Sequence, residues 1–76
     1  MSKTTLITMA NEIAAFFVSE NDPAEAPKSV AGHLKRYWDP RMRKQIIEHV
    51  TSSGGEGLVP AARAAVELLA AEQASR

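Results

Sequence analysis

The chain has 76 residues, the size of one small domain, and its nine Lys and Arg balance nine Asp and Glu. A net charge of zero provides no overall field that would draw the protein to nucleic acid or to an anionic membrane. The absence of cysteine excludes disulfides, thiolate metal sites, iron–sulfur ligation and a thiol nucleophile.

The first predicted element is a helix over residues 5–20, with Thr4 or Thr5 as its N-cap. The N-terminal residues reach Glu12 before any long apolar run, so we expect neither a signal peptide nor a membrane span in this segment. We expect a cytoplasmic protein. On a helical wheel the apolar residues cover roughly 200°, about twice the stripe of a surface helix. The helix therefore lies centrally among the others or leaves part of its face for another chain. The apolar residues are Leu6, Ile7, Met9, Ala10, Ile13, Ala14, Phe16, Phe17 and Val18.

Residues 20–27 predict an acidic loop, since they combine two prolines and three acidic side chains without apolar periodicity. A second helix is expected over residues 28–38, capped by Ser29. Its expected inner residues are Val30, Leu34 and Tyr37. The stretch that follows this helix is basic, and a fold that brings the acidic loop to it would neutralise both charges.

The helix break at Asp39-Pro40 predicts a sharp elbow. Proline disfavours helical backbone in the residue before it and fits a helix only in its first turn. Asp39 is therefore the expected N-cap, and Pro40 the first residue, of a third helix over residues 40–52. Tyr37 and Trp38 should then lie on the inside or the rim of the elbow.

A glycine-rich loop and an alanine-rich helix complete the predicted elements. The Ser-Ser-Gly-Gly run at residues 52–55 is a C-terminal signal for the third helix, and Pro60 opens a fourth helix over residues 60–73. Alanines dominate the inner face of this last helix, which allows close approach between helices but buries little area.

These elements predict an all-α fold without strands. We expect a single domain over residues 1–76, built as a small compact bundle of four short helices with a sharp elbow at Asp39-Pro40. The ends, residues 1–4 and 74–76, are expected to fray.

The sequence offers little for catalysis or metal binding. His33 and His49 lie sixteen positions apart on different predicted helices, without the i, i+3 or i, i+4 spacing of helical metal ligands. The glycines at 54, 55 and 57 follow a helix rather than a strand, so they predict a helix stop and not a phosphate-binding loop. We expect no catalytic residue, no metal and no cofactor in this chain.

The elbow mixes cations with aromatic rings, which is compatible with two kinds of partner. A nucleic-acid-binding regulator would use such a mixture, although the zero net charge makes this the weaker alternative. Trp, Tyr and Arg are also the residues most enriched in protein–protein hot spots. Arg41 and Arg43 fall in the first turn of the third helix, where the helix dipole disfavours cations, and a carboxylate-rich partner would offset that.

We therefore interpret the elbow as a protein-binding patch. In this hypothesis the arginines pair with carboxylates of the partner and Trp38 enters a pocket. The patch consists of His33, Tyr37, Trp38, Arg41 and Arg43. A structural homodimer that uses the first helix is an alternative, and a homo-oligomer is also open when the chain is isolated.

Three segments within roughly residues 8–66 carry a family resemblance. They are Asn11-Glu12-Ile13-Ala14 with Phe16-Phe17, His33-Leu34 followed by residues 37–43, and Gly54-Gly55 with Gly57-Leu58 and Pro60. With them the chain resembles the delta subunit of NAD-dependent, molybdenum-containing formate dehydrogenase. The WDPRMR run at 38–43 is the most specific part, and Tyr37 stands where the family is expected to have Phe.

The resemblance implies a non-catalytic accessory subunit without a cofactor of its own. Its partner would be the catalytic alpha subunit, which it would stabilise or help to receive its molybdenum cofactor. In that family formate is oxidised at a bis-molybdopterin guanine dinucleotide in the alpha subunit, and iron–sulfur clusters pass the electrons to flavin and NAD in other subunits. The homodimer and the nucleic-acid-binding regulator remain alternatives.

Overall fold

The computed structural model describes residues 2–20 and 22–74 and is all-α. Its four helices are α1 (Lys3–Glu20), α2 (Ala26–Tyr37), α3 (Pro40–Ser53) and α4 (Pro60–Ala74). The predicted number and order of helices are confirmed. All helix bounds lie within two residues of the prediction, and α1 and α2 each begin two residues earlier than expected. Within the described ranges, no helix has the length and apolar character needed to cross a bilayer.

The starts of α1 and α2 differ from the predicted caps. The Ser2 hydroxyl accepts a hydrogen bond from the Thr5 backbone N–H at 3.2 Å, so Ser2 and not Thr4 or Thr5 caps α1. Before α2, the Asp22 carbonyl accepts from the Ala26 N–H at 3.1 Å and forms the turn that starts this helix. The following proline falls in the first turn, where its missing N–H does no harm, so α2 begins earlier and Ser29 is not its cap.

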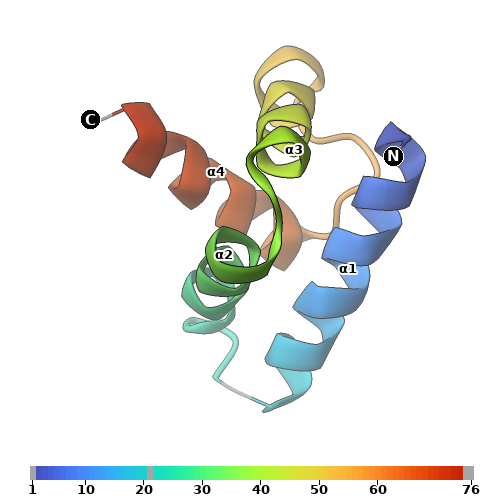
Figure 1. Ribbon diagram of the computed structural model, residues 1–76. Coiled ribbons are helices and arrows are strands. Elements are labelled where there is room, and N and C mark those ends of the chain that lie inside the picture. The colour runs from blue at the N-terminus through green and yellow to red at the C-terminus, as the bar shows by residue number, and fades with distance from the viewer. Residues whose placement is uncertain (1, 21, 75–76) are drawn as a thin grey trace.

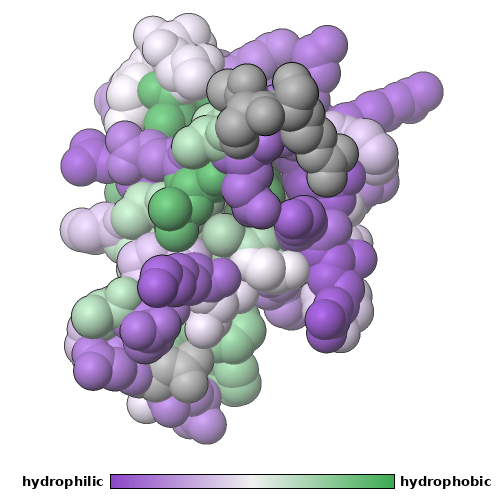
Figure 2. All heavy atoms as spheres, turned by 90° about the vertical axis from the view of Figure 1, so that its left-hand side faces the viewer, coloured by the Kyte–Doolittle hydropathy of each residue, from purple (hydrophilic) through white to green (hydrophobic). Residues whose placement is uncertain are grey.

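The four helices surround one core, and the elbow leads from α2 to α3 (Figure 1). Helices α1 and α4 each pack against the other three, whereas α2 and α3 pack mainly on α1 and α4. Ala10 and Ala14 of α1 and Ala62 and Ala65 of α4 are fully buried, and such small side chains allow helices to approach closely. The largest buried hydrophobic side chains are Leu6, Val30, Leu34, Trp38, Ile46, Val66 and Leu69. Figure 2 shows that the face on the left of Figure 1 is largely hydrophilic, with hydrophobic side chains scattered over it.

The elbow is capped as the sequence predicts. Asp39 has extended backbone (φ −74°, ψ 165°), and its Oδ1 accepts a hydrogen bond from the Met42 backbone N–H at 3.0 Å. Pro40 takes the first position of α3, where a proline needs no hydrogen-bond partner. At the other side of the elbow, the Trp38 N–H donates to the Leu34 carbonyl at 3.0 Å and closes α2.

We expect Asp39→Ala to lower the free energy of unfolding by about 0.5 to 2 kcal/mol, because the Met42 N–H loses its acceptor. Urea unfolding followed by circular dichroism measures the change. Asp39→Asn keeps an oxygen at the same place and should retain most of the stability. An unchanged midpoint for the alanine variant would remove the capping role from Asp39.

Glycine ends α3, as predicted from the Ser-Ser-Gly-Gly run. Gly54 has a φ of 70°, a left-handed conformation that glycine adopts without steric cost. Its N–H donates to the Val50 carbonyl at 3.0 Å, and the next N–H donates to the His49 carbonyl at 3.4 Å. The chain then leaves α3 and crosses to α4 through residues 54–59.

Candidate protein-binding surface

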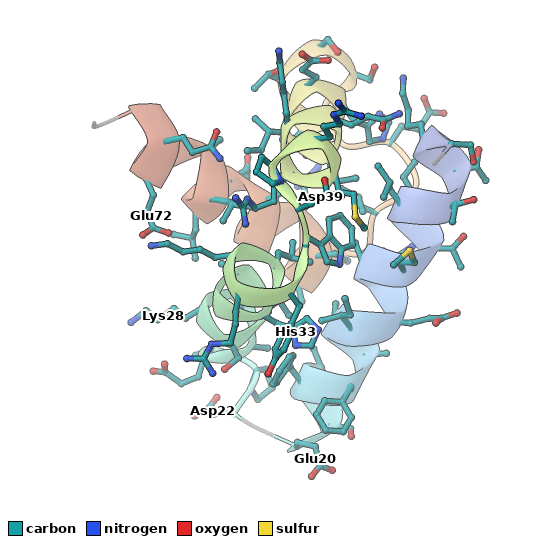
Figure 3. All side chains as sticks on the ribbon, viewed as in Figure 1. Glu20, Asp22, Lys28, His33, Asp39 and Glu72 are labelled. Carbon is teal, nitrogen blue, oxygen red and sulfur yellow. The ribbon has the colours of Figure 1, made fainter. Side chains whose placement is uncertain are left out.

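Four aromatic rings form a row between the C-terminal half of α1 and α2. Phe16 and Phe17 meet edge to face with their centroids 5.2 Å apart, Phe17 meets His33 at 5.9 Å, and His33 meets Tyr37 at 4.7 Å. His33 and Tyr37 share one face of α2 because they are four residues apart. In Figure 3, His33 lies between α2 and α1. We call these four residues the aromatic row.

The outer members of the aromatic row face solvent. Tyr37 is 67% exposed and Phe16 is 59% exposed, while Phe17 and His33 are partly buried. An open hollow of about 420 Å³ lies against the row and is also lined by Arg36. The row therefore presents aromatic surface beside a cation, the combination that is enriched at protein–protein hot spots.

Trp38 departs from the predicted binding patch. It is only 5% exposed and belongs to the hydrophobic core, so its indole cannot enter a pocket on a partner. The reason is local, since Trp38 is four residues after Leu34, to whose carbonyl its N–H still donates at 3.0 Å, and so its side chain continues the buried stripe of α2. Tyr37, which the helical stripe placed on the inner side of α2, is exposed instead.

Arg43 has a role inside the elbow. Its Nη1 donates to the carbonyl oxygens of Lys35 at 2.7 Å and Trp38 at 2.8 Å. These carbonyls lie at the C-terminal end of α2, where the helix dipole favours a cation. For Arg43, the unfavourable dipole of α3 is therefore offset by these carbonyls within the domain, and not by a carboxylate of a partner as expected from the sequence. Arg41 is exposed and makes no hydrogen bond or ion pair with another described residue.

The acidic loop does not neutralise the elbow. Glu20, Asp22 and Glu25 are exposed, and none of them pairs with a cation in the parts of the chain that the structure describes. Lys35 instead pairs with Glu72 of α4 at 2.9 Å, with both side chains about half exposed. Such an exposed pair contributes little to stability. The loop and the basic elbow therefore remain two separate charged features.

A comparison with protein families shows to which family the chain belongs. The sequence model described as "NADH-dependant formate dehydrogenase delta subunit FdsD" matches residues 5–66. The chain belongs to this family. No curated protein and no solved structure matches it. The match covers α1, α2, α3 and the first half of α4, so the elbow and both exposed ends of the aromatic row belong to the FdsD-like part.

Within this FdsD-family domain, Asn11 connects α1 to the loop before α4. Its Nδ2 donates to the Gly57 carbonyl, and its Oδ1 accepts from the Val59 N–H, both at 2.9 Å. The Asn11 side chain thus serves as the hydrogen-bond partner of one backbone acceptor and one backbone donor of the loop. In the sequence Asn11 was only part of the family resemblance, and this role was not predicted.

His49 connects the same loop to α3. It is 5% exposed, and its Nε2 lies 2.6 Å from the Glu56 carbonyl oxygen. Because a carbonyl only accepts, Nε2 carries the proton, and Nδ1 has no hydrogen-bond partner among the described residues. In the sequence His49 was considered only as a possible metal ligand, and its place in the buried interior was missed.

The described residues hold no group of three His, Asp or Glu side chains placed to bind a metal ion. His33 lies in the aromatic row and His49 in the core, so the two histidines do not meet. What the FdsD-family domain presents to solvent is the aromatic row with Arg36, the unpaired Arg41 at the start of α3, and the separate acidic loop.

Proposed function

We propose that this chain is a non-catalytic accessory subunit that binds the catalytic alpha subunit of a cytoplasmic NAD-dependent formate dehydrogenase. In this role it stabilises the alpha subunit or supports insertion of its molybdenum cofactor. The observation that supports the proposal most is the exposed aromatic row, in which Tyr37 and Phe16 present large apolar rings to solvent. Family membership supports the formate dehydrogenase context.

The aromatic row has the composition of a binding surface. Aromatic side chains bury a large area at a small cost in conformational freedom, and they and Arg dominate interface hot spots. Arg41 lies at the unfavourable end of a helix dipole, and a carboxylate of the partner would offset that cost. The proposed contact residues are therefore His33, Tyr37 and Arg41, joined by Phe16 and Arg36. Trp38 and Arg43 position this surface from within the elbow.

The proposal leaves the redox chemistry to other subunits. The chain has no cysteine, so it supplies no thiolate to an iron–sulfur cluster. The bis-molybdopterin guanine dinucleotide and the clusters belong, in this proposal, to the partner subunits. This chain contributes binding area and not a reacting group.

The test compares binding of the purified alpha subunit to the wild-type chain and to a Tyr37→Ala, Arg41→Ala variant. Both residues are exposed, so circular dichroism should show unchanged helicity. Because truncation of a hot-spot residue costs about 2 kcal/mol or more, we expect the dissociation constant to rise at least tenfold. Isothermal titration calorimetry at one fixed salt concentration measures it.

A matched control changes an exposed cation and an exposed apolar residue elsewhere, Lys44→Ala with Leu68→Ala. This variant should bind like the wild type. If the control and the test variant weaken binding equally, the aromatic row is the wrong surface. If the wild-type chain does not bind the alpha subunit, the accessory role itself is wrong.

A homodimer is the second candidate, because Phe16 and Val18 of α1 are both exposed although they are large and apolar. It predicts a concentration-dependent change in mass. Sedimentation equilibrium on the wild type and on Phe16→Ser separates the two candidates, since only the homodimer requires wild-type chains to associate with each other.

A further inference from the structure

A second exposed surface lies on a different flank of α1. It is an open groove of about 530 Å³. One wall is the stripe Asn11, Ala14, Ala15 and Val18, and the other wall is Pro23, Pro27, Val59, Pro60 and Ala61. Phe16 is two positions from both Ala14 and Val18, which is about 200° around the helix axis. The groove and the exposed end of the aromatic row therefore face in different directions.

Among the described residues, the groove has no free polar side chain to orient a small polar ligand. Asn11 is the one polar side chain among them that lines it, and both its amide atoms are already bonded to the loop through Gly57 and Val59. Three of the remaining lining residues are prolines, which have no backbone N–H to offer. Ligand sites need a few convergent polar groups for orientation, so this groove suits an apolar surface.

The shape of the groove fits a helix. Positions 11, 14, 15 and 18 follow the i, i+3, i+4, i+7 spacing and extend over about 10 Å of α1. The middle of this stripe is alanine, so the backbone of a second helix can come close and place larger apolar side chains into the groove. This is the arrangement in which an amphipathic helix binds an apolar groove.

The charge of the acidic loop indicates what kind of helix would bind in the groove. The acidic loop, with Glu20, Asp22 and Glu25 exposed, lies at the end of the groove where Pro23 forms its wall. Figure 3 shows Glu20 and Asp22 at the lower end of the molecule, while Lys28 points away to the side of α2. None of the three carboxylates has a cationic partner within the described ranges. A helix with Lys or Arg at the corresponding end would supply one.

We propose that this groove binds an amphipathic helix of another subunit of the formate dehydrogenase complex, with its apolar face in the groove and a basic end at the acidic loop. The inference rests on the proposed function for its setting in that complex, but it uses a different surface. The domain would then contact two segments of the complex at once, an acidic one at the aromatic row and a basic helix at the groove.

Site-specific photo-crosslinking in cells that produce the whole complex tests the two surfaces separately. A benzophenone amino acid replaces Ala15 in one variant and Tyr37 in another, both of which are exposed. We expect the probe at 15 to crosslink a helical segment of another subunit that has an apolar stripe and Lys or Arg at one end. The probe at 37 should crosslink a different segment.

The outcomes distinguish the inference from the proposed function. Three outcomes overturn the inference alone. The probe at 15 crosslinks a second copy of this chain, it crosslinks a segment without a basic amphipathic helix, or it crosslinks nothing while the probe at 37 does crosslink. A crosslink from 15 with none from 37 supports the groove and moves the proposed function to another surface. Failure of both probes overturns both.

A synthetic peptide of the crosslinked segment then gives the size of the effect. Ala15→Arg fills the groove and should weaken binding of this peptide at least tenfold, whereas Ala71→Arg on the exposed side of α4 should not change it. At low salt, Glu20→Gln and Glu25→Gln should each weaken it by about twofold to fivefold, an effect that high salt removes. Equal binding by wild type and Ala15→Arg would overturn the inference.

Discussion

Trp38→Ala is expected to lower the free energy of unfolding by about 3 to 5 kcal/mol. The indole is 5% exposed and belongs to a hydrophobic cluster whose other buried members are Leu, Ile, Val and Ala side chains. Neighbouring alanines cannot extend to fill the space it would leave. A domain of this size has a total stability of about 4 to 11 kcal/mol, so the variant loses a large part of it. Thermal and urea unfolding, followed by circular dichroism, measure the loss.

The neighbouring aromatic residue is the control. Tyr37→Ala removes a ring that is 67% exposed and should change the stability by no more than about 0.5 kcal/mol. Conversely, Tyr37→Ala should weaken partner binding while the folded fraction stays constant. Equal destabilisation by the two substitutions would contradict the assignment of Trp38 to the core and Tyr37 to the surface.

The helix ends were the most predictable part of the fold, because local chemistry determines them. Asp39-Pro40 provides a cap and a preset backbone angle, and Gly54 provides the left-handed residue that ends α3. Neither signal depends on distant residues. The start of α2 was less predictable, because a turn formed by Asp22 determines it and the proline that looked like a boundary lies inside the first turn.

Periodicity alone did not decide between Tyr37 and Trp38. The helical stripe extends correctly to Leu34, which is buried. Tyr37 is three residues and Trp38 four residues after Leu34, so helical spacing places both of them beside this stripe. Which of two adjacent aromatic residues is buried then depends on where α1 and α4 lie, and these helices are distant in sequence.

The same limit applies to the polar contacts and to the groove. Asn11 bonds to Gly57 and Val59, which lie more than 40 positions further along the chain. The groove combines α1, the acidic loop and the start of α4. The broad apolar face of α1 predicted that this helix either lies centrally among the others or leaves part of its face for another chain. In the structure α1 contacts all three other helices and also leaves apolar side chains exposed. The prediction could not indicate that the exposed part divides into an aromatic row and a groove.

His49→Ala should lower the free energy of unfolding by about 2 to 4 kcal/mol. It removes a buried ring and the donor that the Glu56 carbonyl uses. His49→Gln can place an amide N–H near the same carbonyl and should recover about 1 kcal/mol of the loss. His33→Ala, at the partly buried histidine of the aromatic row, should cost less than about 1 kcal/mol and serves as the matched control.

The consequence of His49→Ala should extend to the groove, because His49 and Asn11 hold the 54–59 loop from two sides, and Val59 lines the groove. Amide hydrogen exchange of Leu58, whose N–H donates to the Gly55 carbonyl at 2.9 Å, reports on this loop. We expect its exchange to accelerate more in His49→Ala than in His33→Ala, relative to the amides of α2. If both variants accelerate exchange uniformly over the whole domain, His49 contributes only to global stability. If Leu58 alone accelerates, the buried histidine holds the loop that forms one wall of the groove.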